Sequence, residues 1–277
     1  MSLAELQVWE WRAGLFVFGA VFGSFLNVVI HRVPRGESVV RPGSRCPACG
    51  APIKAWQNIP ILSWLLLRGR CANCRQPISW RYPLVELLTA LLWLAVGVRF
   101  GVSLQALILL PCATLLLALF FTDYDEMLLP DALTIPMAIV GVAVASWNSR
   151  LDLFIGWLGS GTASGRLAHA VVGAVFGFGL FLAIALAGRL AFGKEAMGGG
   201  DLKLMLGVGA FLGIPGVVLT LFLGSIVGTF VAIPMLLKGR TALGKTLPFG
   251  CFLCPAALLC VFYGNELARW YLGLLGP

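Results

Sequence analysis

Long apolar stretches separated by short polar segments run through most of this 277-residue chain. A helix that crosses a bilayer needs about 20 apolar residues, and the pattern predicts about eight such helices. They cover residues 14–30, 83–98, 104–121, 131–147, 167–186, 202–212, 217–237 and 249–267. The sequence therefore predicts an all-α polytopic membrane protein, in which the sixth segment is short and rich in glycine.

The longest polar segment, rich in Pro and Arg, separates the first two apolar runs. We expect three parts: an N-terminal transmembrane helix (1–32), a small polar domain between helices 1 and 2 (33–82), and a membrane domain (83–277). Residues 148–166 form a connector with several Gly and Ser residues, to which the sequence assigns no role.

Composition and charge support a membrane location. The chain is 59% hydrophobic and 12% charged, whereas a soluble domain carries about 25% charged residues. The net charge of +8 does not indicate nucleic-acid binding, because the basic residues lie between apolar runs. With eight spans, 15 Lys and Arg residues fall on one side and 5 on the other. This asymmetry places 33–82 in the cytoplasm and the N-terminus outside.

The N-terminus does not resemble a cleavable signal peptide. Its first 11 residues contain Glu5 and Glu10 and no Lys or Arg, so the basic region that precedes a signal sequence is missing. We therefore expect the first span to be retained.

Two CxxC pairs in the cytoplasmic segment, Cys46 with Cys49 and Cys71 with Cys74, have the spacing of a zinc ribbon. We therefore expect residues 33–82 to form a small cytoplasmic zinc-ribbon-like domain between helices 1 and 2. A four-thiolate site is closed, so the predicted Zn²⁺ is structural rather than catalytic. Two disulfides are the alternative, which the reducing cytoplasm disfavours.

Acidic residues stand at the ends of two apolar runs, where a carboxylate is costly and marks a functional candidate. Asp123 directly follows the 104–121 run, and Asp201 directly precedes the 202–212 run. In the predicted orientation both lie at the cytoplasmic face, at similar depth. Two close carboxylates that share a proton supply the base and the acid of an aspartyl protease.

A simpler interpretation makes these acids helix caps or solvated loop residues. Asp131 follows Pro130 and fits an N-cap, and Asp201 fits an N-cap of the sixth span. The three glycines at 198–200 then need another reason. Glycines allow close backbone approach, and irregular backbone at membrane depth is tolerated where it lines a site.

Two other classes of protein remain open at this point. Intramembrane acids also serve ion- or proton-coupled transporters, but the two acidic motifs show no internal repeat of the kind that transporters carry. A zinc-ribbon adaptor on a membrane anchor would leave the acids and glycines unexplained. The two histidines, His31 and His169, offer neither a Ser-His-Asp nor an HExxH arrangement.

A family resemblance rests on motifs that run nearly from end to end. They are segments 23–34, 58–64 and 81–86, the two cysteine pairs, Asp123 with Leu129-Pro130-Asp131, and Gly198-Gly199-Gly200-Asp201 with Lys203. Together and in this order they resemble bacterial type IV prepilin peptidases, also called prepilin leader peptidase/N-methyltransferases, of the GxGD aspartyl protease group.

The resemblance implies that Asp123 and Asp201 are catalytic, supported by Pro130, Asp131, Gly198, Gly199, Gly200 and Lys203. Asp123 is chosen over Asp125 because the family aspartate lies seven residues before the motif proline, here Pro130; Asp125 is the alternative. Neither the methyl-donor site nor the oligomeric state is assigned.

The resemblance also implies the substrate and the location. Substrates would be prepilins or pseudopilins whose basic leader ends in Gly, cut at the cytoplasmic face of the inner membrane. N-methylation of the new N-terminal residue from S-adenosylmethionine would follow. The expected partners are these substrates and the lipid bilayer, without nucleic acid.

Overall fold

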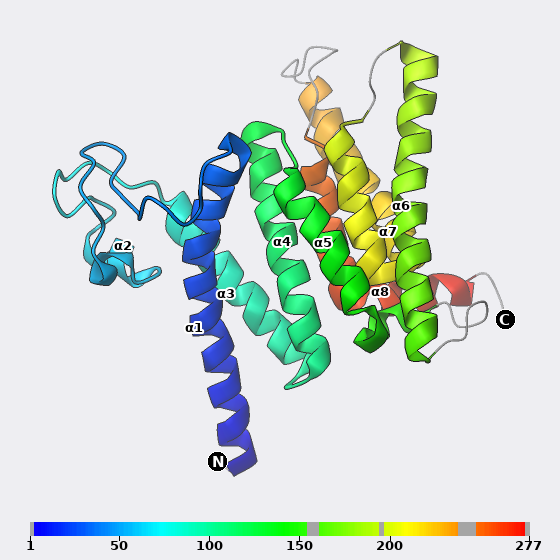
Figure 1. Cartoon of the computed structure of the whole chain (residues 1–277), viewed down its shortest axis with the longest axis horizontal. Helices are drawn as coiled ribbons and strands as arrows, with labels where there is room; N and C mark the ends of the chain where they lie inside the picture. Colours follow the sequence, from blue (N-terminus) through cyan, green and yellow to red (C-terminus); the bar gives the residue numbers. More distant parts are fainter. Residues whose placement is uncertain (1–2, 154–160, 194–196, 238–247, 275–277) are drawn as a thin grey trace. The chain divides into compact units, whose positions relative to one another are not determined.

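The computed structural model describes residues 3–153, 161–193, 197–237 and 248–274. These residues form helices and loops, with two isolated β-bridges and no strand among them. The chain divides into two compact units, Met1–Ala106 and Leu107–Pro277, which are described separately (Figure 1). Lys194 and the basic residues within 238–247, which entered the charge count, lie outside the described residues.

The first unit consists of two long helices and the cysteine-bearing segment between them. These helices are α1 (Leu3–Arg32) and α3 (Arg81–Phe100); between them lie η1 (Val33–Arg35), η2 (Ala55–Asn58) and the short α2 (Leu62–Leu66). A Cβ at Gly23 of α1 would lie 2.7 Å from the Glu86 Cα of α3, so the two helices pack at close range. The Asn27 side-chain amide donates to the Tyr82 carbonyl at 3.1 Å, which links the same two helices.

The second unit is a helical bundle. It contains α4 (Leu104–Glu126), α5 (Asp131–Ala143), η3 (Ala145–Trp147), η4 (Ser149–Leu153), α6 (Ala163–Phe192), α7 (Gly199–Leu237) and α8 (Gly250–Leu274). α7 packs against α5, α6 and α8, and Figure 1 shows these helices side by side. α7 is therefore the central element of this unit.

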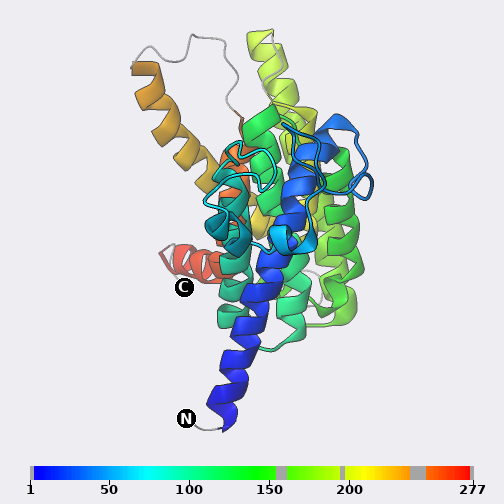
Figure 2. The same ribbon diagram turned by 90° about the vertical axis from the view of Figure 1, so that its left-hand side faces the viewer.

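α7 is interrupted at Gly213, whose φ of 66° and ψ of −171° are non-helical. A positive φ is accessible to glycine at little cost, and Pro215 follows within the next turn of helix. The kink separates a first arm that begins at Gly199 from a second arm that ends at Leu237. Figure 2 shows the second arm, coloured gold to orange, directed away from α6. The two arms correspond to the sixth and seventh predicted segments.

Among the described residues, six helices are long and apolar enough to cross a membrane, and α5 is a shorter apolar helix. Counted with the second arm of α7, they match the eight predicted segments and confirm an all-α polytopic membrane protein. Most helices extend beyond the predicted apolar runs, as α1 and α6 do at both ends. In contrast, α5 stops short of its predicted end, because the helix ends at Ala143 and the chain continues to Trp147 as a 3-10 turn. The next residue, Asn148, is fully buried and donates to the Phe211 carbonyl at 2.7 Å, which requires the chain to turn there.

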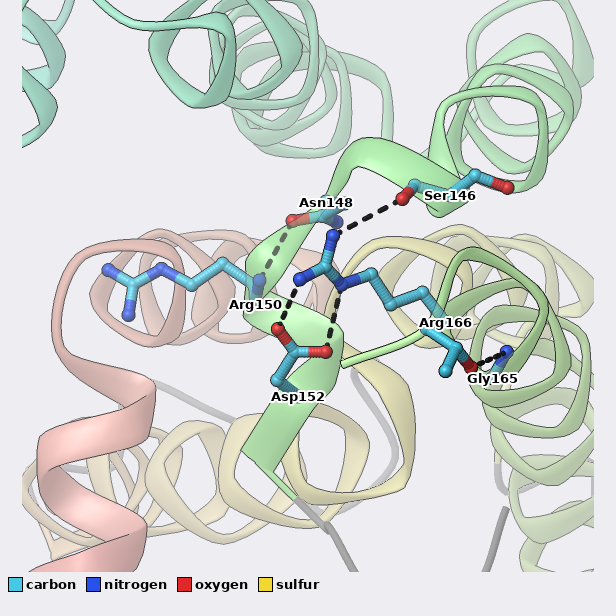
Figure 3. A network of polar contacts seen from close by, with 7 residues as sticks. Ser146, Asn148, Arg150, Asp152, Gly165 and Arg166 are labelled. Carbon is cyan, nitrogen blue, oxygen red and sulfur yellow. Dashed lines mark hydrogen bonds and ion pairs between the residues drawn. The ribbon is translucent and has the colours of Figure 1, made fainter. Parts of the chain in front are cut away.

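The first residues of the 148–166 connector form a polar network (Figure 3). Arg166 of α6 donates to both carboxylate oxygens of Asp152 in η4, at 2.9 and 2.7 Å, and to the Ser146 carbonyl at 3.3 Å. The Arg150 guanidinium donates to the Phe262 carbonyl of α8 at 2.8 Å. We call this the connector network; it ties the described ends of the connector to α6 and α8.

Candidate active site

The second unit brings together the two carboxylates that the sequence singled out. Asp123 lies in the last turn of α4 and Asp201 in the first turn of α7. Their exposed fractions are 5% and 7%, and they lie close enough to repel each other electrostatically. Within the described residues, neither carboxylate forms an ion pair with a basic side chain. Two buried acids thus share one site, and the described part of the chain supplies no cation to neutralise them.

The beginning of α8 completes the surroundings of Asp123. The Cys251 backbone N–H donates to Asp123 Oδ2 at 2.8 Å, so the carboxylate accepts a bond from an otherwise unpaired donor in the first turn of α8. The positive end of the helix dipole also favours an anion there. A Cβ at Gly250 would lie 2.8 Å from the same oxygen, so only glycine permits this approach without displacement.

Leu129 lies between the two acidic elements. It is buried, and a Cβ at Gly200 of α7 would lie 2.7 Å from its Cβ, while a Cβ at Gly250 would lie 3.1 Å from its Cδ1. In contrast, a Cβ at Gly199 would meet nothing within 4 Å. Of the consecutive glycines, Gly200 is therefore the one that close packing requires, and it lets α7 approach the loop that follows α4.

The remaining motif residues surround this site. The Gly198 carbonyl accepts the Asp201 backbone N–H at 3.1 Å. The Lys203 ammonium contacts both oxygens of Asp131 at 2.6 and 2.7 Å, in an exposed ion pair that joins α7 to α5. Neither Asp131 nor Asp201 is an N-cap. Pro130 is the N-cap of α5 and Asp131 lies in the first turn of that helix. Asp201 lies two residues after Gly199, the first residue of α7.

The structure separates Asp123 from its alternative, Asp125. Asp125 is exposed at the end of α4, whereas Asp123 is buried beside α8. Burial raises the cost of a carboxylate, and a buried acid without a cation is the kind of group found at functional sites. This difference supports Asp123 as the partner of Asp201.

The four cysteines of the first unit form one cluster. All four Sγ atoms lie within 4.8 Å of one another, and a contact of 3.8 Å between the Sγ atoms of Cys46 and Cys74 joins the two pairs. The pairs are held by matching turns: Cys46 N–H donates to the Ala51 carbonyl and Cys71 N–H to the Gln76 carbonyl, each at 2.9 Å. Four converging thiols suit a tetrahedral metal ion.

The surroundings of Cys49 favour the thiolate form of its side chain. The Asn73 side chain donates to Cys49 Sγ at 3.6 Å, and this hydrogen bond is the main cause that lowers the pKa of the Cys49 thiol to about 6. The thiolate is the form that binds metal. The cluster therefore has the donor set of a metal site.

The sequence does not indicate that some residues of the acid site belong to it. Gly250 and Cys251 lie 127 and 128 positions after Asp123 in the sequence. The hydrogen bond from Cys251 to Asp123 therefore joins residues that are far apart along the chain. Gly250 precedes an apolar run, which is compatible with a helix start but does not indicate contact with an acid. Leu129 is part of the family motif, yet its role as the packing contact of two glycines is visible only in three dimensions.

Comparisons with known proteins agree with this arrangement. The Bacterial Peptidase A24 N-terminal domain matches residues 17–100, and the Type IV leader peptidase family matches residues 108–233. A prepilin leader peptidase/N-methyltransferase of Aeromonas hydrophila is 39% identical over 296 residues, covering 98% of this chain and 97% of the relative. One of Pseudomonas putida is 39% identical over 282 residues, covering 94% and 93% respectively.

A relative of the same name from Myxococcus xanthus is 44% identical over 232 residues, covering 84% of this chain and 65% of the relative. No solved structure gives a significant match.

Fold and site together define a multi-pass membrane protein with a buried acid pair and a four-thiol cluster. The comparisons show that the chain belongs to the type IV leader peptidase family, a family of aspartic peptidases. The resemblance found in the sequence is thereby confirmed, and the chain is an enzyme of this family.

Proposed function

We propose that this enzyme cleaves the basic leader of type IV prepilins or pseudopilins after a Gly, at the cytoplasmic face of the bacterial inner membrane, with Asp123 and Asp201 as the catalytic pair. The observation that carries the proposal is the meeting of these two buried carboxylates, from α4 and α7, without a basic partner in the described residues. The names of the relatives support the choice of substrate.

In this mechanism the pair holds one proton. The ionised carboxylate removes a proton from a water molecule, which attacks the carbonyl carbon of the scissile peptide, while the protonated carboxyl donates to the carbonyl oxygen. The tetrahedral intermediate then collapses: its hydroxyl returns a proton to the second carboxylate, the C–N bond breaks, and the leaving nitrogen takes the proton that the first carboxylate had removed from the water. Two neighbouring carboxyl groups cannot both ionise easily, because the resulting negative charges repel each other. This repulsion favours a pair that holds one proton. The Cys251 N–H, 2.8 Å from Asp123 Oδ2, would orient this carboxylate.

We further propose that the enzyme N-methylates the new N-terminal residue from S-adenosylmethionine, as the relatives' names suggest, and that Cys46, Cys49, Cys71 and Cys74 hold a structural Zn²⁺. The ion would fix the fold of residues 33–82, where few large aliphatic side chains are buried. We keep the proposed division into 1–32, 33–82 and 83–277, with the N-terminus outside.

A cleavage assay on the reconstituted protein tests this function. The substrate is a prepilin with a Gly-Phe junction, and product masses are recorded with and without S-adenosylmethionine. We expect cleavage by the wild type and by Asp125→Asn, loss of cleavage in Asp123→Asn and Asp201→Asn, and a methyl-sized mass increase with the donor. Loss in Asp125→Asn but not in Asp123→Asn would move the pair, and cleavage by all variants would reject the aspartyl mechanism in favour of a transporter.

A further inference from the structure

The short helix α2 in the cysteine-bearing segment exposes large apolar side chains. Leu62, Leu65 and Leu66 are 58%, 57% and 80% exposed; we call these three leucines the α2 face. Their spacing of three and four residues places them on one side of a helix. Trp56 and Trp80, which flank α2 in the sequence, are also more than half exposed. An apolar group of this kind marks an interaction surface.

The depth of α2 along the membrane helices points to what it contacts. The backbone N–H of Ile61, the residue before α2, donates to Glu86 Oε2 at 2.7 Å. Glu86 lies five residues into α3, which corresponds to about 7 Å along the helix axis. α2 therefore starts beside the first turns of a candidate membrane span, and Figure 1 shows it lower than the start of α3, in the direction in which α3 runs.

The backbone at this point is held in an unusual conformation. Ile61 has φ 63° and ψ −53°, and the Leu62 N–H donates to the Pro60 carbonyl at 2.6 Å, which is a tight γ-turn. A β-branched residue at positive φ is rare, because its side chain clashes with the backbone there. The buried Glu86 carboxylate compensates by accepting the Ile61 N–H. The turn fixes the position at which α2 begins, so the fold determines where the three leucines lie.

Charge around α2 complements an anionic surface. Residues 33–82 contain eight Lys and Arg residues and a single acid, Glu37. A groove of about 540 Å³ opens beside α2, lined by Trp64, Arg68, Arg70 and Trp80 among others. Arginine next to tryptophan is typical of the interface between lipid headgroups and acyl chains.

We propose that the α2 face inserts into the headgroup–acyl boundary of an anionic phospholipid leaflet, with Arg68 and Arg70 meeting lipid phosphates at the groove. The segment is continuous at both ends with candidate membrane spans, α1 and α3, so it is tethered at the bilayer surface. Burying three leucines and pairing two guanidinium groups are each favourable in this position. The cysteine cluster would then be held close to the leaflet. This inference goes beyond the proposed activity and does not depend on it.

A photo-crosslinking experiment tests the surface. Benzoylphenylalanine replaces Leu66 in the full chain, which is reconstituted in vesicles of phosphatidylglycerol or of phosphatidylcholine, irradiated and analysed by mass spectrometry. Val40, 77% exposed in the same segment, carries the reagent as a control. We expect lipid adducts at position 66, most in phosphatidylglycerol, and fewer at position 40. Adducts to residues 107–277 or to a second chain, equal yields at both positions, or no adduct at 66 would overturn the proposal.

A second comparison tests the role of the two arginines. Arg70 and Arg45 occupy equivalent places in the two cysteine turns, where they bridge to Pro77 and Pro52 respectively. With the reagent at position 66, Arg68→Gln and Arg70→Gln should each lower the preference for phosphatidylglycerol over phosphatidylcholine by up to about fivefold. Arg45→Gln should leave it unchanged. Equal effects of all three substitutions would reject the groove as the site that binds lipid phosphate. The metal content of each variant is measured as well, because it reports whether the cysteine cluster is intact.

Discussion

The second unit treats its buried charges in two different ways at its two ends. At the connector network, Asp152 receives two hydrogen bonds from Arg166, at 2.9 and 2.7 Å, and Arg150 donates to the Phe262 carbonyl at 2.8 Å and lies 3.8 Å from the Glu266 carboxylate. At the other end, Asp123 and Asp201 repel each other and find no cation among the described residues.

The difference distinguishes charges that stabilise the fold from the acid pair that we propose as catalytic. A bidentate Arg–carboxylate pair neutralises both partners, so the connector network tolerates its partial burial. An acid pair without a cation costs stability at any pH at which both groups ionise. A fold keeps such an arrangement where a reaction needs it. This contrast between a paired and an unpaired end leads to four predictions.

The largest effect is expected from Asp201→Asn. It removes one member of the proposed acid–base pair, so cleavage of a prepilin should fall by about 10²–10⁴-fold. Because it also removes a repulsion between buried charges, the thermal midpoint in detergent should stay constant or rise. Asp125→Asn, at an exposed position of α4, is the control and should retain activity. A lowered melting midpoint together with retained cleavage would contradict the proposal, because Asp201 would then stabilise the fold and not take part in catalysis.

The next effect concerns packing at the acid end. Gly200→Ala places a Cβ 2.7 Å from the Leu129 Cβ, and such overpacking costs about 1–3 kcal/mol. Displacement of the loop after Asp123 should also reduce cleavage, by about tenfold to a hundredfold. Gly199→Ala is the matched control, since its Cβ meets nothing within 4 Å. Thermal melts and kcat/KM measure both effects, and equal behaviour of the two variants would contradict the structure.

At the opposite end, Arg166→Gln should lower stability and leave the chemistry intact. It removes two charge-assisted hydrogen bonds from the half-buried Asp152, an expected loss of about 1–3 kcal/mol in the free energy of unfolding. The double variant with Asp152→Asn should recover part of this loss, because no unpaired carboxylate remains. Retention of cleavage below the new melting midpoint is the essential readout. If activity disappeared while the protein remained folded, the connector network would belong to the active site.

The smallest effect is expected for Lys203→Gln. This variant breaks the ion pair with Asp131, but both side chains are exposed, by 38% and 58%. Exposed pairs contribute about 0–1 kcal/mol, so the melting midpoint should change little. Asp131→Asn should give a similarly small change, and the double variant no more. A loss larger than that of Arg166→Gln would show that exposure does not distinguish the two ion pairs.

Much of the fold could be predicted because each membrane helix is determined by one continuous apolar run of the sequence. The length and order of the apolar runs predicted α1 and α3 to α8, including the division of α7, whose Gly213 and Pro215 interrupt the pattern. The end of α5 was missed by four residues, because it depends on a hydrogen bond from Asn148 to Phe211, 63 positions away. Apolar composition alone does not distinguish a continuing α-helix from a 3-10 turn.

The sequence by itself determined which residues are candidates for chemistry. Two acids at the ends of apolar runs and two CxxC pairs were readable because a buried charge and a thiol spacing each have a physical cost or a geometric requirement. The convergence of the four Sγ atoms within 4.8 Å agrees with that spacing.

Only the tertiary structure decided which partners these residues meet. The burial of Asp123, the approach of Gly250 and the Cys251 N–H, and the need for glycine at 200 but not at 199 all arise where α4, α7 and α8 pack together. Likewise, the depth of α2 follows from one hydrogen bond between Ile61 and Glu86. Such contacts join residues far apart in the chain, and their energies depend on packing geometry that no local pattern of residues encodes.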